Sequence, residues 1–256
     1  TITAASSDRR RAITMSGSDS SAMTASRCST ERNTIQAIPL ATIVSAEIAA
    51  KEASVSGVHV TYAPMVDLVR DPRWGRVMES TGEDPYLNSE YARAFVRGFQ
   101  GHDLTGDLDR VAACVKHFAA YGAAEAGRDY NTVDVSERQL REFYLPAYKA
   151  ALDEGCEMVM TSFNTVDGIP ATGNSNLMRK LLREEWGFNG VLISDWGAVK
   201  ELIAHGIAAD EEEAALKAMK AGVDIEMMTA CYAHHLAELI GKGEVREELL
   251  DEAVMR

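Results

Sequence analysis

The stretch from residue 190 to residue 197 reads Gly-Val-Leu-Ile-Ser-Asp-Trp-Gly and joins a short apolar run to a carboxylate and an aromatic ring. Residues 191–194 have the length and apolar character of a buried strand. The run ends at Asp195, and Trp196 follows directly. A carboxylate in this place is either the N-cap of the next helix or a nucleophile beside an aromatic wall. The residues alone leave both interpretations open.

Apolar runs of the same kind recur along the chain and alternate with helical segments. They predict strands at residues 58–63, 111–115, 158–162, 191–194 and 223–227. Short apolar strands separated by helices are typical of a parallel sheet covered by helices. Because polar clusters follow strand after strand, we predict an α/β fold of the (β/α)8 TIM-barrel type, incomplete at its N-terminal end. An open doubly wound sheet is the alternative, and the lack of a Gly-x-Gly-x-x-Gly motif before a helix weakens it.

Helix boundaries are marked by capping residues and glycines. Ser136 and Gln139 form a capping-box pattern before a helix whose apolar stripe continues to Ala151. Residues 79–85 are expected to begin another helix, because acidic residues favour that end of a helix. Glycines are expected where helical stripes stop, because they accept the left-handed backbone conformation. They are Gly101, Gly155, Gly187, Gly206, Gly222 and Gly241.

The bulk composition excludes several classes of function. The 256 residues carry a formal net charge of −13, which opposes a general nucleic-acid surface because phosphate binding needs clustered lysine and arginine. No run approaches the ~20 apolar residues of a membrane span, and no secretion signal is visible, so the compartment stays open. We predict no cofactor and no metal site, and interpret the adjacent His234 and His235 as a solvated pair. The four cysteines lie far apart and are interpreted as free thiols: Cys28, Cys114, Cys156 and Cys231.

The first 37 residues differ in composition from the rest of the chain. They are rich in serine and threonine, contain no lysine, hold the basic run at residues 9–11 and show no apolar periodicity. We interpret residues 1–37 as a disordered or damaged segment. Residues 38–256 are interpreted as one barrel domain.

Polar residues follow the first two predicted strands. The loop at residues 67–76 holds three arginines and two acids, and a guanidinium such as that of Arg76 can bridge two adjacent hydroxyl groups or brace a carboxylate. Arg70, Asp71 and Arg73 are expected to form local charge pairs at the surface. Lys116 and His117 end the second strand, and both can reach one ligand only if the regular strand breaks there, because neighbours in a strand face opposite ways. The following loop, residues 121–132, receives no chemical role.

From about residue 38 onward the sequence resembles glycoside hydrolase family 3, in particular its bacterial β-glucosidases. Several motifs of that family occur in the expected order. They are Ala63-Pro64-Met65-Val66-Asp67, Arg70-Asp71-Pro72-Arg73-Trp74-Gly75-Arg76, Gly82-Glu83-Asp84-Pro85, Val115-Lys116-His117-Phe118-Ala119-Ala120-Tyr121-Gly122, Tyr130-Asn131-Thr132-Val133-Asp134, Ser162-Phe163-Asn164, Asp167-Gly168-Ile169-Pro170-Ala171 and Gly190-Val191-Leu192-Ile193-Ser194-Asp195-Trp196.

The resemblance implies a set of site residues. Asp195 would be the nucleophile of a retaining β-glycosidase, which forms a covalent glycosyl-enzyme intermediate on terminal β-D-glucosyl residues. Arg76, Lys116 and His117 would hold hydroxyl groups of the sugar in the innermost subsite. Trp196 would border that subsite, as would Phe163, which stands where many relatives have tyrosine and therefore lacks a hydroxyl near the nucleophile.

The resemblance also implies what comes from elsewhere. Retention needs a second carboxyl group about 5 Å from the first, and in these β-glucosidases it usually comes from a following domain, so the acid/base is expected outside this chain. An Asp-x-x-His-Gly segment that binds sugar in relatives has no match in residues 1–37. The expected ligand is a β-glucoside or oligosaccharide, and no nucleic-acid or membrane partner is expected. Relatives are often periplasmic or secreted. The alternative is a non-catalytic carbohydrate-binding remnant of the same fold.

Overall fold

The computed structural model describes residues 39–256, so the predicted atypical segment and Cys28 lie outside the described residues. The strands are β1 Val60–Thr61, β2 Ala112–Phe118, β3 Met158–Thr161, β4 Thr165–Val166, β5 Ile169–Pro170 and β6 Val191–Ile193. The α-helices are residues 39–55, α2 Pro85–Gln100, α3 Glu137–Gln139, α4 Pro146–Asp153, α5 Ala198–Ala204, α6 Glu211–Ala221, α7 Cys231–Gly241 and α8 Glu247–Met255. Shorter 3-10 turns are η1 Val77–Glu79, η2 Tyr121–Ala123, η3 Glu125–Gly127 and η5 Ala171–Gly173, and π-helical segments are η4 Leu140–Tyr144 and η6 Asn176–Glu185.

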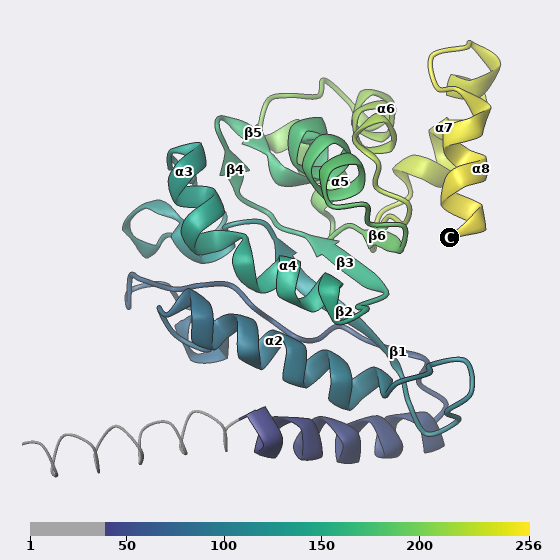
Figure 1. Cartoon of the computed structure of the whole chain (residues 1–256). Coiled ribbons are helices and arrows are strands. Elements are labelled where there is room, and N and C mark those ends of the chain that lie inside the picture. Colours follow the sequence, from purple (N-terminus) through teal and green to yellow (C-terminus); the bar gives the residue numbers. More distant parts are fainter. Residues whose placement is uncertain (1–38) are drawn as a thin grey trace, which may run out of the picture. The chain divides into compact units, whose positions relative to one another are not determined.

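A parallel sheet with the strand order β1-β2-β3-β6 forms the centre of the described region (Figure 1). Each connection between successive strands of this sheet contains helix, as parallel pairing requires. The helix over residues 39–55 packs against α2 so closely that a side chain at Gly98 would meet Ala46. β3 is buried along its whole length, which explains why its sequence is continuously apolar.

The fifth predicted strand, residues 223–227, forms only an isolated parallel bridge between Ile225 and Ile193. Asp224 and Ile225 both donate backbone N–H groups to the Leu192 carbonyl, and the chain then turns through Met228, which has a positive φ of 63°. The prediction of a full strand was therefore wrong, although the segment lies at the predicted place beside β6. The predicted first strand is also shorter than expected, since β1 covers only Val60–Thr61.

The capping signals were mostly confirmed. Asp84 caps α2 by accepting hydrogen bonds from two backbone N–H groups, and the Ser136 side chain accepts one from Gln139 N. The long helix predicted after Ser136 is interrupted by η4, because Pro146 has no N–H to continue the regular ladder and Leu145 N bonds to Leu140 O instead. Most of the predicted glycines follow helices with a positive φ, but Gly241 is the last residue of α7.

The described core is apolar and contains three free cysteines, Cys114, Cys156 and Cys231, all buried. This confirms the free-thiol interpretation for those three residues. Among the described residues, no helix combines the length and apolar character needed to cross a membrane.

Candidate active site

Asp195 follows the C-terminal end of β6, and the neighbouring segment at residues 225–227 holds its loop in place. Ser194 N donates to Ile225 O (2.9 Å), and Met227 N donates to the Ser194 hydroxyl (2.9 Å). Gly197 N donates to Met227 O (3.0 Å). The fifth segment, although not a full strand, therefore fixes the backbone on both sides of Asp195.

The Asp195 carboxylate is buried, with 8% of the residue exposed, and only partly satisfied by hydrogen bonds. One oxygen, Oδ1, accepts from Trp196 N at 2.6 Å. The other, Oδ2, lies 3.5 Å from His117 Nε2 and makes no hydrogen bond to any described residue. Burial raises the pKa of Asp195, while the charges of His117, Arg76 and Lys116 lower it by less. The charges of Lys116 and Arg76 therefore offset part of the effect of burial on the pKa of Asp195, but burial outweighs them.

Asp67, a residue to which the sequence analysis assigned no role, contacts the side of the His117 ring that faces away from Asp195. His117 Nδ1 lies 2.7 Å from Asp67 Oδ2, and the Tyr148 hydroxyl donates to Asp67 Oδ1 at 2.7 Å. All three side chains are fully buried. With Nδ1 bound to Asp67, Nε2 of the same ring faces Asp195. Asp67 is thus placed to fix the orientation of the imidazole.

The break that would let both Lys116 and His117 face one site is present. The register between β2 and β3 shifts between Val115 and Phe118, so the regular alternation ends there. The Lys116 backbone bonds to the residues before Asp67, and its side chain, half-buried, makes no hydrogen bond within the described part of the chain. Its charge nevertheless lowers the pKa of both Asp195 and Glu79.

Arg76 also belongs to this cluster. Its guanidinium donates two hydrogen bonds to Glu79, from Nε at 2.7 Å and from Nη2 at 2.8 Å, and lies over the Tyr121 ring at 5.6 Å. These hydrogen bonds raise the pKa of Arg76 and lower the pKa of Glu79. Glu79 was predicted to begin a helix, but it ends the short turn η1 and braces Arg76.

Of the remaining charged residues of the loop at 67–76, Asp71 and Arg73 pair with each other as predicted, whereas Arg70 contacts a residue outside the loop. Arg73 forms a surface ion pair with Asp71 at 2.6 Å, and Arg70 lies over the Phe143 ring at 5.0 Å. The cluster at the carboxyl ends of the strands therefore contains Asp195, His117, Lys116 and Arg76 but not these surface pairs.

Residues 22–256 match the sequence model described as the glycosyl hydrolase family 3 N terminal domain. The chain belongs to this family.

Relatives within family 3 agree with the resemblance and confirm the barrel-like α/β class. The periplasmic beta-glucosidase of Salmonella typhimurium is 50% identical over 206 residues, which cover 80% of this chain and 27% of the relative. A putative beta-xylosidase of Formosa agariphila is 34% identical over 213 residues. The crystal structure of a beta-glucosidase from Listeria innocua in complex with glucose matches with a TM-score of 0.83 and 62% identity, over 84% of this chain and 30% of that one. The chain thus spans less than a third of the length of these two β-glucosidases.

An aromatic wall lies beside the cluster in this family 3 domain. Phe163 is buried, and its ring lies 5.7 Å from Tyr121 and 4.3 Å from Tyr130. The Tyr121 ring in turn meets His117 edge-on at 5.3 Å. Trp196 is 62% exposed and is therefore free to cover a ligand beside Asp195. Phe163 thus belongs to a network of rings that reaches His117, and Trp196 directly follows Asp195.

The loop at residues 121–132, to which sequence reasoning gave no role, supports this wall. Asp129 accepts a hydrogen bond from the Trp74 indole at 3.0 Å. Gly127 has a positive φ of 66°, and a side chain there would collide with the Trp74 backbone nitrogen. The two loops therefore depend on each other, through contacts between residues 55 positions apart that no local pattern reveals.

A further carboxyl group, Glu201 on α5, is near Asp195 and was missed by the sequence analysis. It is partly buried, and its Oε2 is buried without a hydrogen bond among the described residues. Burial and the charge of Asp195 raise the pKa of Glu201. The signal that could have found it is its spacing, since an acid six residues after Asp195 falls on the helix that starts at the same loop.

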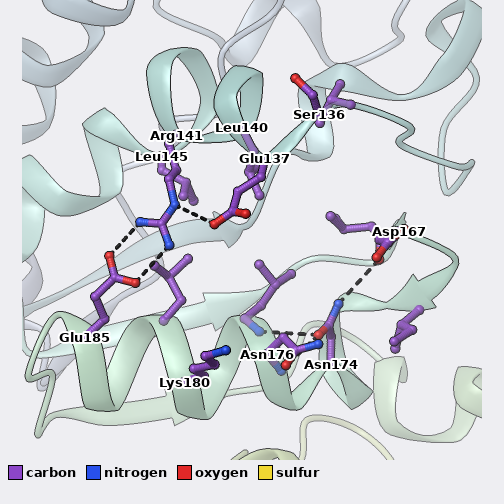
Figure 2. Close-up of a pocket in the computed structure, with 15 residues that line it drawn as sticks. Ser136, Glu137, Leu140, Arg141, Leu145, Asp167, Asn174, Asn176, Lys180 and Glu185 are labelled. Atoms are coloured by element: carbon purple, nitrogen blue, oxygen red, sulfur yellow. Dashed lines mark hydrogen bonds and ion pairs between the residues drawn. The ribbon is translucent and has the colours of Figure 1, made fainter.

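A cavity of about 520 Å³ lies elsewhere, between the α3–η4 helix and η6. Figure 2 shows Arg141 at its edge, bound to Glu137 and Glu185. It contains none of the predicted site residues. The predicted site residues therefore lie in the strand-end cluster and do not line this cavity.

Proposed function

We propose that this chain carries the barrel part of a retaining β-glucosidase that acts on terminal β-D-glucosyl residues. The family and the identities with β-glucosidases, 50% for the Salmonella protein and 62% for the Listeria protein, support this substrate class over the β-xylosides named for more distant relatives. The glucose complex of the Listeria protein supports a glucose-sized subsite. The periplasmic location named for the Salmonella relative supports a site of action outside the cytoplasm.

The observation that carries the proposal is the unsatisfied Oδ2 of Asp195. A nucleophile needs a lone pair that is not already used by hydrogen bonds, and Oδ2 has no donor among the described residues while Oδ1 is anchored by Trp196 N. In the proposed first step, Oδ2 attacks the anomeric carbon, a carbon–oxygen bond forms, and the leaving group departs with a proton from the acid. Water then hydrolyses the glycosyl ester.

The cations and rings around Asp195 have separate roles in this proposal. His117 Nε2 and the Lys116 ammonium bind sugar hydroxyls, because Nε2 lies 3.5 Å from the Asp195 carboxylate and the charge of Lys116 acts on the same carboxylate. Arg76 binds through Nη1, which its bonds to Glu79 leave available. Trp196 covers the sugar, and Phe163 supports the aromatic wall behind it.

We infer that the acid/base carboxyl group lies outside these 256 residues. The chain corresponds to less than a third of its β-glucosidase relatives, which supports a contribution from another part of the protein. Glu201 is the competing candidate within the chain, because its carboxyl has a raised pKa near Asp195.

Hydrolysis of 4-nitrophenyl β-D-glucoside, followed by proton NMR of the first-formed sugar, tests the proposal. We expect slow release of β-glucose, with the matching β-xyloside a poorer substrate and no release by Asp195→Asn. α-Glucose as first product would contradict the retaining mechanism. Glucose binding without any hydrolysis of this activated substrate would instead favour a carbohydrate-binding remnant.

A further inference from the structure

A second cluster of ligand-type side chains lies between α6 and α7, away from Asp195. Glu211 is the first residue of α6, and His234 and His235 are neighbours on α7. One carboxylate oxygen of Glu211 and one ring nitrogen from each histidine all lie within 4.8 Å of one another. The two histidines, which the sequence suggested were a solvated pair, therefore converge on a common acid.

The donor set has the chemistry of a transition-metal site. Two imidazole nitrogens and one carboxylate oxygen suit Zn²⁺, which binds these atoms at about 2.0–2.2 Å. Tetrahedral donors on one such ion lie about 3.4 Å apart, so donors that are up to 4.8 Å apart must approach one another by about 1.4 Å. His234 is exposed and the other two side chains are half-buried, so side-chain rotations can achieve this approach. The fourth position would be open to water.

The helices that carry these donors are held together independently of a metal. Lys242, directly after α7, forms an ion pair with Glu212 of α6 at 2.6 Å. The donors are therefore presented by two packed helices, which limits the entropy lost on binding an ion.

Lys200 of α5 occupies part of this cluster. Its ammonium lies 2.6 Å from Glu211 Oε1 and lowers the pKa of Glu211. An ammonium and a divalent cation would compete for the same carboxylate, and they repel each other. Lys200 is therefore a competitor of a metal ion for Glu211. It lies on α5, which begins two residues after Trp196.

We propose that Glu211, His234 and His235 form a binding site for a divalent transition metal such as Zn²⁺, in competition with Lys200. The site is separate from the proposed glycosidase function and does not depend on it.

Calorimetric titration of the metal-free full chain with ZnCl2 tests the proposal. We expect one site of about micromolar affinity, weakened at least tenfold by each of His234→Asn, His235→Asn and Glu211→Gln. His102→Asn, which changes an exposed histidine outside the cluster, is the matched control and should leave the affinity unchanged. Lys200→Met, which keeps the side-chain length but removes the charge, should tighten binding several-fold.

Titration with Co²⁺ identifies the donor atoms. A nitrogen and oxygen site gives visible d–d bands without the intense near-ultraviolet band of a thiolate ligand, which separates this cluster from any binding by cysteines. Circular dichroism of each variant checks that it is folded. Binding weaker than about millimolar, an affinity in the three cluster variants equal to that of the unaltered protein, or weaker binding by Lys200→Met would each overturn the proposal.

Discussion

Two aspartates with largely buried side chains lie beside β6 and differ in how completely their oxygens are used by hydrogen bonds. Asp224 accepts from Arg183 at 2.6 Å, from Arg256 at 2.9 Å and from Leu192 N at 2.8 Å. Asp195 follows the C-terminal end of β6 and accepts one backbone hydrogen bond, from Trp196 N to Oδ1. Its second oxygen, Oδ2, lies 3.5 Å from His117 Nε2. Both carboxylates are largely removed from water, but only the first is fully compensated.

The difference separates a carboxylate that stabilises the fold from one that is available for chemistry. A buried charge is costly unless it is paired and hydrogen-bonded, so the partners of Asp224 make it a structural anchor for β6. Asp195 lacks that compensation, which leaves a lone pair exposed to a ligand. The two residues should therefore respond in opposite ways to loss of charge.

The largest effect is expected for Asp195→Asn. The amide keeps the shape and can still accept from Trp196 N, but it cannot attack the anomeric carbon, so kcat/KM for an aryl glucoside should fall by at least about 10⁴-fold. The free energy of unfolding, measured in urea at neutral pH, should not decrease. A loss of stability as large as the one predicted next for Asp224→Asn would remove the distinction between the two residues.

Asp224→Asn should destabilise the chain by about 3 kcal/mol or more, because the largely buried Arg183 loses its charge partner. Urea unfolding monitored by circular dichroism measures this change. Glucosyl transfer per folded molecule should stay close to the wild-type value. An unchanged midpoint would show that the Arg183 pair contributes little.

Asp67→Asn should lower kcat/KM about 10- to 100-fold, since it removes the charged partner that orients His117. Tyr148→Phe removes one donor from the same carboxylate and should cost about 1 kcal/mol of stability with a smaller effect on activity. Nitrogen-15 NMR of the His117 ring should show an altered tautomer balance only in Asp67→Asn. Equal ring spectra in all three proteins would reduce Asp67 to a packing role.

The pH dependence should report the burial of Asp195. Because burial raises its pKa above the ordinary 3.8, the rate of glycosyl-enzyme formation should fall, as pH decreases, with an apparent pKa above 3.8. For the same reason, the stability contributed by this group is present below pH 3.8 and lost as pH rises through the raised pKa, and Asp195→Asn escapes that loss. An acid limb at or below 3.8 would contradict the effect of burial.

The smallest effect is expected for Glu201→Gln, about threefold or less on 4-nitrophenyl glucoside, if the acid/base lies elsewhere. Steady-state rates with 4-nitrophenyl and with a less activated aryl glucoside measure it. A loss above about 100-fold confined to the less activated substrate would assign the acid role to Glu201 instead.

The sequence predicted the elements that depend on local patterns. The apolar runs at β2, β3 and β6, the caps at Asp84 and Ser136, and the position of Asp195 after its strand all follow from neighbouring residues. Family resemblance added the sugar-binding roles of Arg76, Lys116 and His117, whose charges all act on Asp195 in the structure.

Contacts between distant residues could not be predicted in this way. Asp67 and His117 are 50 residues apart, and Tyr148 is a further 31 residues along, so no local pattern joins them. The segment at 223–227 reads as a strand because it is apolar, yet it pairs only at Ile225, where Asp224 turns its side chain to Arg183. Tertiary partners, rather than propensity, decided these details.

The most direct test of the account is intact mass after incubation with a 2-fluoro β-glucoside that carries a dinitrophenolate leaving group, which departs without acid catalysis. We predict a gain of one fluoroglucosyl group, mapped by peptide analysis to Asp195 and absent in Asp195→Asn. Labelling of another residue, or no labelling in a sample that circular dichroism shows to be folded, would contradict the assignment of Asp195 as the nucleophile.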